Sequence, residues 1–140
     1  MLELSFAQQS FISSDKLKVI LNQIITQTDQ SEAERYTVSF NDTDYSAEHG
    51  GFRPVEIAIN QTASGEWIIE YITEFAYFGN YYPELERSVD FDISSGSWFM
   101  AYSGWSSIDC DDCREFYNLW ESNFIQYIEM KVYDSITVTE

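Results

Sequence analysis

The chain has 140 residues, of which 24 are acidic and 7 are basic, so its formal net charge at pH 7 is -17. This charge argues against binding to nucleic acids or to anionic membranes, because both attract basic surfaces. A content of 44% hydrophobic and 17% aromatic residues argues against a disordered acidic tail. The length fits one domain, residues 1–140. The N-terminus carries no signal-peptide pattern, and two cysteines do not form a disulfide framework, so we expect a soluble cytoplasmic protein.

Hydrophobic periodicity predicts two helices. Leucine and isoleucine recur at spacings of three and four residues from Leu17 to Ile25, which is typical of a helix with one buried face. A second helix is predicted from Asp112, because an apolar stripe extends from Phe116 to Ile128. Each helix therefore presents one apolar face that another layer of the domain must cover.

Between the helices, alternating apolar and polar residues predict strands separated by short turns. They are expected at residues 36–40, 55–60, 66–78, 87–94 and 98–102, with a short last strand at 136–138. Closely spaced strands with short turns form antiparallel hairpins. The predicted fold class is α+β, with an antiparallel sheet of about five to six strands and two helices packed on one face.

Strand parity predicts an acidic face on this sheet. If the apolar residues of neighbouring strands share one core, the carboxylates that alternate with them share the opposite face. These are Glu56, Glu70, Glu74, Asp90 and Asp92. Ile68 and Ile72 would lie among them and could form the centre of a homodimer interface. The alternative is that the acidic residues only keep the protein soluble.

The loop at residues 41–54 is a second candidate site. It contains the only histidine, His49, beside Glu48, and one of the few basic residues, Arg53. Histidine titrates near neutral pH, so His49 could act as an acid or a base. The residues predicted to bind a ligand are Tyr45, Glu48, His49 and Arg53 at the mouth of a pocket, with Tyr71 and Glu74 inside. The alternative is a structural loop in which Arg53 pairs with a carboxylate.

No metal or cofactor is expected. Cys110 and Cys113 form a single C-x-x-C pair, whereas a structural zinc site needs four ligands. Sequence motifs for a nucleophile elbow, a phosphate-binding loop or a dinucleotide site are absent, and no catalytic residue is predicted. Cys113 lies on the apolar side of the second helix, where we expect it to be buried.

Three segments together resemble an uncharacterised bacterial family, a domain of unknown function that also occurs in integron gene cassettes. The segments are residues 44–57, 71–77 and 119–124. The resemblance covers most of the chain from the first helix onward. It implies a single α+β domain, a bacterial cytoplasmic setting and a homo-oligomer, and it supplies no catalytic residues.

The sequence supports three functional hypotheses. The first is a non-enzymatic, homodimeric binding module that presents an acidic and aromatic surface to a basic protein segment or a small cationic ligand. The second is a small-molecule pocket protein, which could be an enzyme, of cystatin-like or cone-shaped α+β architecture with its site at residues 44–53. The third is a mimic of nucleic-acid charge that binds a DNA-binding protein.

Overall fold

The computed structural model describes residues 4–28 and 32–140. In chain order the elements are α1 (Lys16–Gln27), β1 (Arg35–Asn41), β2 (Val55–Gln61), β3 (Trp67–Phe78), β4 (Glu84–Asp92), β5 (Ser97–Met100), β6 (Gly104–Ser107), α2 (Asp111–Glu129) and β7 (Ser135–Thr139). The strands form one sheet in the order β6-β5-β4-β3-β2-β1-β7, and all neighbours are antiparallel. The first six strands therefore follow one another as a meander, and β7 adds beside β1.

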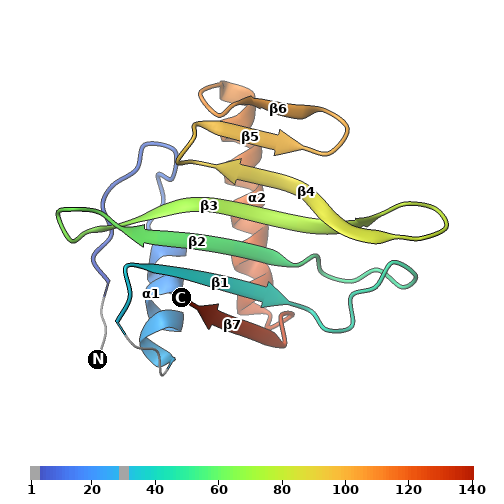
Figure 1. Ribbon diagram of the computed structural model, residues 1–140, viewed down its shortest axis with the longest axis horizontal. Coiled ribbons are helices and arrows are strands. Elements are labelled where there is room, and N and C mark those ends of the chain that lie inside the picture. Colours follow the sequence, from blue (N-terminus) through green and yellow to red (C-terminus); the bar gives the residue numbers. More distant parts are fainter. Residues whose placement is uncertain (1–3, 29–31) are drawn as a thin grey trace.

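Both helices lie on the same side of the sheet, which leaves the other face open (Figure 1). On α1 the stripe predicted from the periodicity is buried, with Leu17 and Leu21 fully covered. On α2 the side chains of Tyr117 and Phe124 face the sheet and are buried. The α+β class is confirmed. Among residues 4–28 and 32–140, no helix has the length and apolar character needed to cross a membrane.

The sheet has seven strands, so the predicted number of five to six is wrong. The missing strand is β6, a four-residue edge strand of Gly104, Trp105, Ser106 and Ser107. The strand pairs with β5 at the edge of the sheet, and most of its side chains are exposed. It therefore has one apolar side chain and no alternation of apolar and polar residues. A strand that buries so little gives no periodic signal in the sequence.

Aromatic rings build the core between the sheet and α2. Phe91 of β4 is 1% exposed and lies at the centre. Its ring centroid is between 4.9 and 6.3 Å from those of Phe11, Trp98, Phe116, Tyr117 and Trp120. Many of the aromatic residues thus pack in the core, and their contacts hold β4 against α2.

An irregularity in β3 changes which side chains face the helices. In the register with β2, Tyr71 pairs with Ala58 and Ile69 pairs with Ile59, so Glu70 is an extra residue. A bulge of this kind interrupts the alternation of side chains between the two faces. Ile69 and Ile72 are consequently both buried under the helices, although strict alternation would place them on opposite faces.

The prediction assumed uninterrupted alternation in this strand and is wrong beyond the bulge. Ile72 is a core residue and does not lie on the open face. Tyr71 and Phe75, expected in the core, line the open face instead. A second bulge shifts the register between β3 and β4, where Glu74 pairs with Val89 and Phe75 pairs with Arg87.

Candidate functional site

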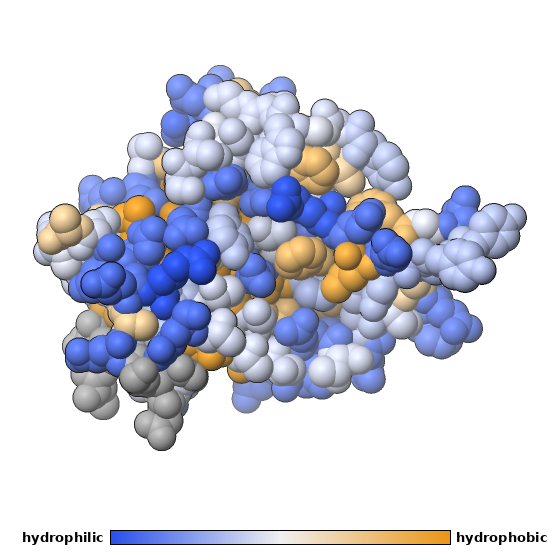
Figure 2. Space-filling model, viewed as in Figure 1, coloured by the Kyte–Doolittle hydropathy of each residue, from blue (hydrophilic) through white to orange (hydrophobic). Residues whose placement is uncertain are grey.

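The open face of the sheet carries a shallow hollow of about 310 Å³ over the middle of β2, β3 and β4. It is lined by side chains of three adjacent strands: Glu56, Tyr71, Thr73, Phe75, Arg87, Asp90 and Asp92. Charged and apolar residues lie side by side over these strands (Figure 2). The register explains the grouping, because Thr73 of β3 pairs with Glu56 on one side and with Asp90 on the other, and Tyr71 pairs with Asp92.

Asp90 is the most unusual group in the hollow. Its side chain is only 8% exposed, and Oδ2 lies 3.2 Å from the Arg87 Nε. The second oxygen, Oδ1, is buried and has no hydrogen-bond partner among the described residues. Burial raises the pKa of Asp90, while Arg87 and Thr73 lower it and the nearby Asp92 and Glu56 raise it. A buried carboxylate oxygen without a donor is destabilising, and a donor from outside would satisfy it.

Arg87 forms one wall of the hollow and is held by aromatic rings as well as by Asp90. Its guanidinium carbon lies 5.8 Å from the ring centroid of Phe99 in β5 and 5.2 Å from that of Trp105 in β6. These distances are typical of cation–π contacts. The open face therefore already accommodates one guanidinium group between a carboxylate and two rings, which shows the chemistry that this surface suits.

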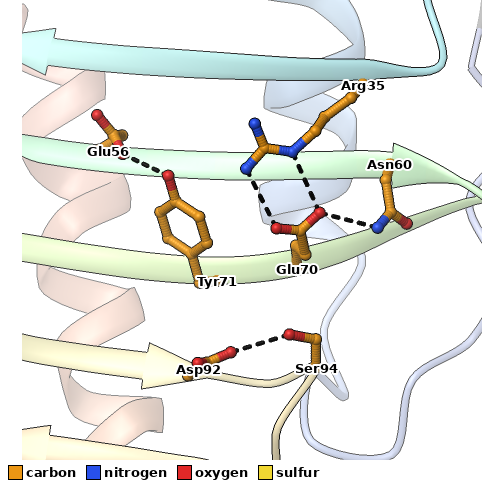
Figure 3. A network of polar contacts seen from close by, with 7 residues as sticks. All are labelled: Arg35, Glu56, Asn60, Glu70, Tyr71, Asp92 and Ser94. Carbon is orange, nitrogen blue, oxygen red and sulfur yellow. Dashed lines mark hydrogen bonds and ion pairs between the residues drawn. The ribbon is translucent and has the colours of Figure 1, made fainter.

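Glu56 and Asp92 bond to hydroxyl groups and form no ion pair among residues 4–28 and 32–140. The Tyr71 hydroxyl donates to Glu56 Oε2, and the Ser94 hydroxyl donates to Asp92 Oδ1 at 2.9 Å (Figure 3). Burial, together with the bond to Glu56, raises the pKa of Tyr71 to about 12, so the phenol remains a donor at neutral pH. Two carboxylates of the hollow are thus bonded to hydroxyl groups and have no ion-pair partner among the described residues.

Glu70, in contrast, is already neutralised. Arg35 Nε and Nη2 donate to its two oxygens at 3.3 and 3.2 Å, and Asn60 Nδ2 donates to Oε1 at 2.8 Å (Figure 3). The bulge in β3 points Glu70 toward β1 and β2, where these donors lie. This carboxylate is therefore part of a closed network beside the hollow.

Glu74 lies on the covered face, which corrects its predicted place in the acidic set. The Trp120 Nε1–H donates to Glu74 Oε1 at 3.1 Å, and Arg53 Nη1 and the Ser88 hydroxyl each donate to Oε2 at 3.3 Å. Glu74 also lines a cavity of about 100 Å³ together with Asn123 and Tyr133. The bulge places the side chain toward α2, where it has three donors.

The residues predicted to bind a ligand fall into separate places. Arg53 and Glu74 come together on the covered face. Tyr45 stacks on Tyr77 with ring centroids 5.2 Å apart, and Glu48 and His49 are exposed and lie 3.8 Å from each other. Tyr71 lies on the opposite face of the sheet, beside Glu56. The structure therefore does not assemble the six into one pocket.

Several residues of the hollow were not selected from the sequence. Thr73 and Phe75 were assigned to the core by alternation, and Arg87 was treated only as part of a strand. A bulge has no reliable signature in sequence, so only the pairing of the strands brings these side chains together.

Comparison with known proteins identifies the family. The model of the protein family described as "Protein of unknown function (DUF2787)" matches residues 15–139. The chain belongs to this family. The three segments that carry the predicted resemblance meet around Glu74, since Arg53, Glu74 and Trp120 come from one segment each. The occurrence of DUF2787 domains in integron gene cassettes stays a prediction.

Two solved structures of Vibrio cholerae proteins are similar over nearly the whole chain. The hypothetical protein VC0508 from the VSP-II pathogenicity island has 45% sequence identity and a TM-score of 0.91, with 98% of this chain and 99% of that chain covered. The conserved hypothetical protein VC1805 from pathogenicity island VPI-2 has 41% identity and a TM-score of 0.75, with 99% and 98% covered. VC1805 is described as sharing structural homology with the human P32 protein. Among curated proteins, no match was found.

Proposed function

We propose that this DUF2787 domain is a binding module whose open sheet face takes up an organic cation, such as an ammonium or guanidinium group. The observation that carries the proposal is the buried Asp90 Oδ1, which lacks a hydrogen-bond donor. Its carboxylate lines a hollow whose other two carboxylates, Glu56 and Asp92, have no basic partner among the described residues. A cation that donates hydrogen bonds would give Asp90 Oδ1 a donor and would bring a positive charge to Glu56 and Asp92.

The charge balance of the open face supports this proposal. The carboxylates of Glu56, Glu70, Asp90 and Asp92 lie there. Two guanidinium groups, those of Arg35 and Arg87, neutralise Glu70 and Asp90. The surplus of negative charge is concentrated on Glu56 and Asp92, which lie on either side of Tyr71 and Thr73. Like charges that gather on one face repel each other, so an incoming cation is attracted to this point.

The spacing favours an organic cation over a metal ion. Glu56 and Asp90 occupy strands on either side of β3, so their backbones are separated by roughly 10 Å, twice the spacing between strands. Metal ligands converge within about 2.6 Å of one ion, which is far shorter. A guanidinium or ammonium group on a carbon stem can contact dispersed carboxylates while its stem packs on Phe75.

Calorimetric titration with n-butylguanidinium tests the proposal, with the neutral n-butylurea as the matched probe. We expect the cation to bind the wild-type protein and the urea not to bind. Asp90→Asn and Asp92→Asn should each weaken binding by about tenfold or more. Glu66→Gln is the control, because it removes one negative charge from an exposed side chain in the turn between β2 and β3. If all three variants lose the same affinity for n-butylguanidinium, binding depends only on the net charge of the protein, and a site at the hollow is refuted.

The homodimer expected from the sequence stays a prediction. Sedimentation equilibrium of the free protein and of the protein with n-butylguanidinium would give the oligomeric state in both conditions. The cation should leave that state unchanged if the hollow lies outside the contact between copies.

A further inference from the structure

Beyond the hollow, the same face of the sheet continues into an exposed aromatic end. Tyr77 and Leu85 pair across β3 and β4, two positions further along from the pair of Phe75 and Arg87. Both are exposed, and the hairpin that follows carries Tyr81 and Tyr82, whose exposed fractions are 91% and 88%. The hairpin between β3 and β4 projects beyond the rest of the sheet (Figure 1). The acidic hollow and this apolar end therefore form one continuous strip.

The hollow alone offers a small cation little contact area. Sites for small ligands usually enclose most of the ligand surface, whereas this hollow is open along one side. Exposed tyrosine and tryptophan side chains are the residues that most often supply binding energy in contacts between proteins. The contact area that the hollow lacks is available on Leu85 and the hairpin tyrosines, and on the part of Tyr77 that the stacked Tyr45 ring leaves exposed.

We propose that the ligand of this strip is an extended basic segment of a partner protein. An arginine or lysine of the segment occupies the hollow beside Asp90, and apolar side chains further along the segment pack on the aromatic end. This inference rests on the proposed function, since it names the class of partner that brings the cation. It commits to a protein segment because a free small cation would leave the aromatic end without a role.

Charge and length both fit this partner. The chain carries a net charge of -17, so a basic segment is attracted and an acidic one is repelled. From Thr73 at the hollow to Tyr77 is four residues along β3, a distance of about 13 Å. Two side chains four residues apart in an extended segment span the same distance and point to the same side.

A pair of designed peptides tests this inference. The first peptide has about nine residues, with a central arginine and a leucine four positions away on either side. Threonines separate them, because β-branched residues favour the extended conformation. The second replaces both leucines with serine. Fluorescence anisotropy of labelled peptides gives the affinities, and n-butylguanidinium serves as the competitor. We expect the leucine peptide to bind about tenfold more tightly than the serine peptide.

Variants of the protein separate this inference from the proposed function. The double variant Tyr81→Ser with Tyr82→Ser should weaken the leucine peptide by about tenfold and change the affinity of n-butylguanidinium by less than about twofold. Both tyrosines are at an exposed hairpin tip, so the fold should be kept. Leu119→Ser is the control, because Leu119 is 62% exposed on α2, which covers the other face.

The outcomes are distinct. Equal affinities of the two peptides, or a tyrosine double variant that binds the leucine peptide like the wild type, would overturn the extended segment and leave the cation site intact. Binding of both peptides and of n-butylguanidinium that is insensitive to Asp90→Asn would overturn the cation site and the segment together. Loss of only the leucine peptide in the tyrosine variant, with loss of all ligands in Asp90→Asn, supports both.

Discussion

Replacing Asp90 by asparagine should stabilise the free protein at neutral pH. The wild-type carboxylate is 8% exposed and leaves Oδ1 without a donor. An unsatisfied buried polar group costs about 1–3 kcal/mol. The ion pair with Arg87, whose side chain is 46% exposed, returns about 0–1 kcal/mol. The amide of asparagine keeps the shape and still lacks a partner at the position of Oδ1, but a neutral group costs less to leave unsatisfied than a charged one, so we expect the free energy of unfolding to rise by about 1 kcal/mol.

The pH dependence gives the sign of this effect. Burial raises the pKa of Asp90 above the ordinary value of 3.8, so folding favours the protonated form. The wild-type protein therefore loses stability as the pH rises through this raised pKa, and the asparagine variant does not. The difference in unfolding free energy should be smallest below pH 3.8 and should grow toward neutral pH. Glu121, whose pKa burial also raises, titrates in both proteins and cancels.

Urea denaturation of both proteins between about pH 3.5 and 8, followed by tryptophan fluorescence, measures this difference directly. A variant that is less stable than the wild type by more than about 1 kcal/mol at pH 7, with the gap closing in acid, would refute the reasoning. It would mean that the contact with Arg87 outweighs the burial of the carboxylate, and that Asp90 is a structural residue with no need of a ligand.

Three further predictions concern stability. His49→Ala should change the free energy of unfolding by less than about 0.5 kcal/mol, because the side chain of His49 is 78% exposed; chemical denaturation measures this, and a loss well above about 1 kcal/mol would contradict the exposed position. Phe91→Ala should lower the free energy of unfolding by about 3–5 kcal/mol in the same assay, since it removes the central ring of the core. A decrease below about 2 kcal/mol would mean that the neighbouring side chains fill the gap. Sodium chloride should raise the melting temperature in calorimetry, since screening weakens repulsion within a chain of net charge -17, and a constant or falling melting temperature would count against that repulsion.

The elements of the fold could be predicted from the sequence because periodicity records burial. The apolar stripes of α1 and α2 and the alternation in β1 and β2 all reflect a face that meets the core. The edge strand β6 buries little, so its residues follow no period. The predicted start of β4, at residue 87, is three residues too late. The strand begins at Glu84 in an exposed hairpin, where polar residues dominate both faces.

The candidate site could be predicted only in part, and the bulge at Glu70 explains why. One extra residue in β3 moves every later side chain of the strand to the other face. Glu74 thereby joins Trp120 and Arg53 beneath the helix layer, while Tyr71 moves to the open face beside Glu56. No register shift separates Asp90 and Asp92 from the core residue Phe91 that lies between them, so both face away from the helices as predicted from alternation.

The most direct test of the cation site is to map n-butylguanidinium onto the wild-type protein by amide chemical shifts in NMR spectra. We expect the largest changes on β2, β3 and β4 around Thr73 and Asp90, and we expect them to disappear in Asp90→Asn. Changes that scatter over exposed acidic residues, such as Asp111 and Asp112 at the start of α2, with no maximum at the hollow, would contradict it.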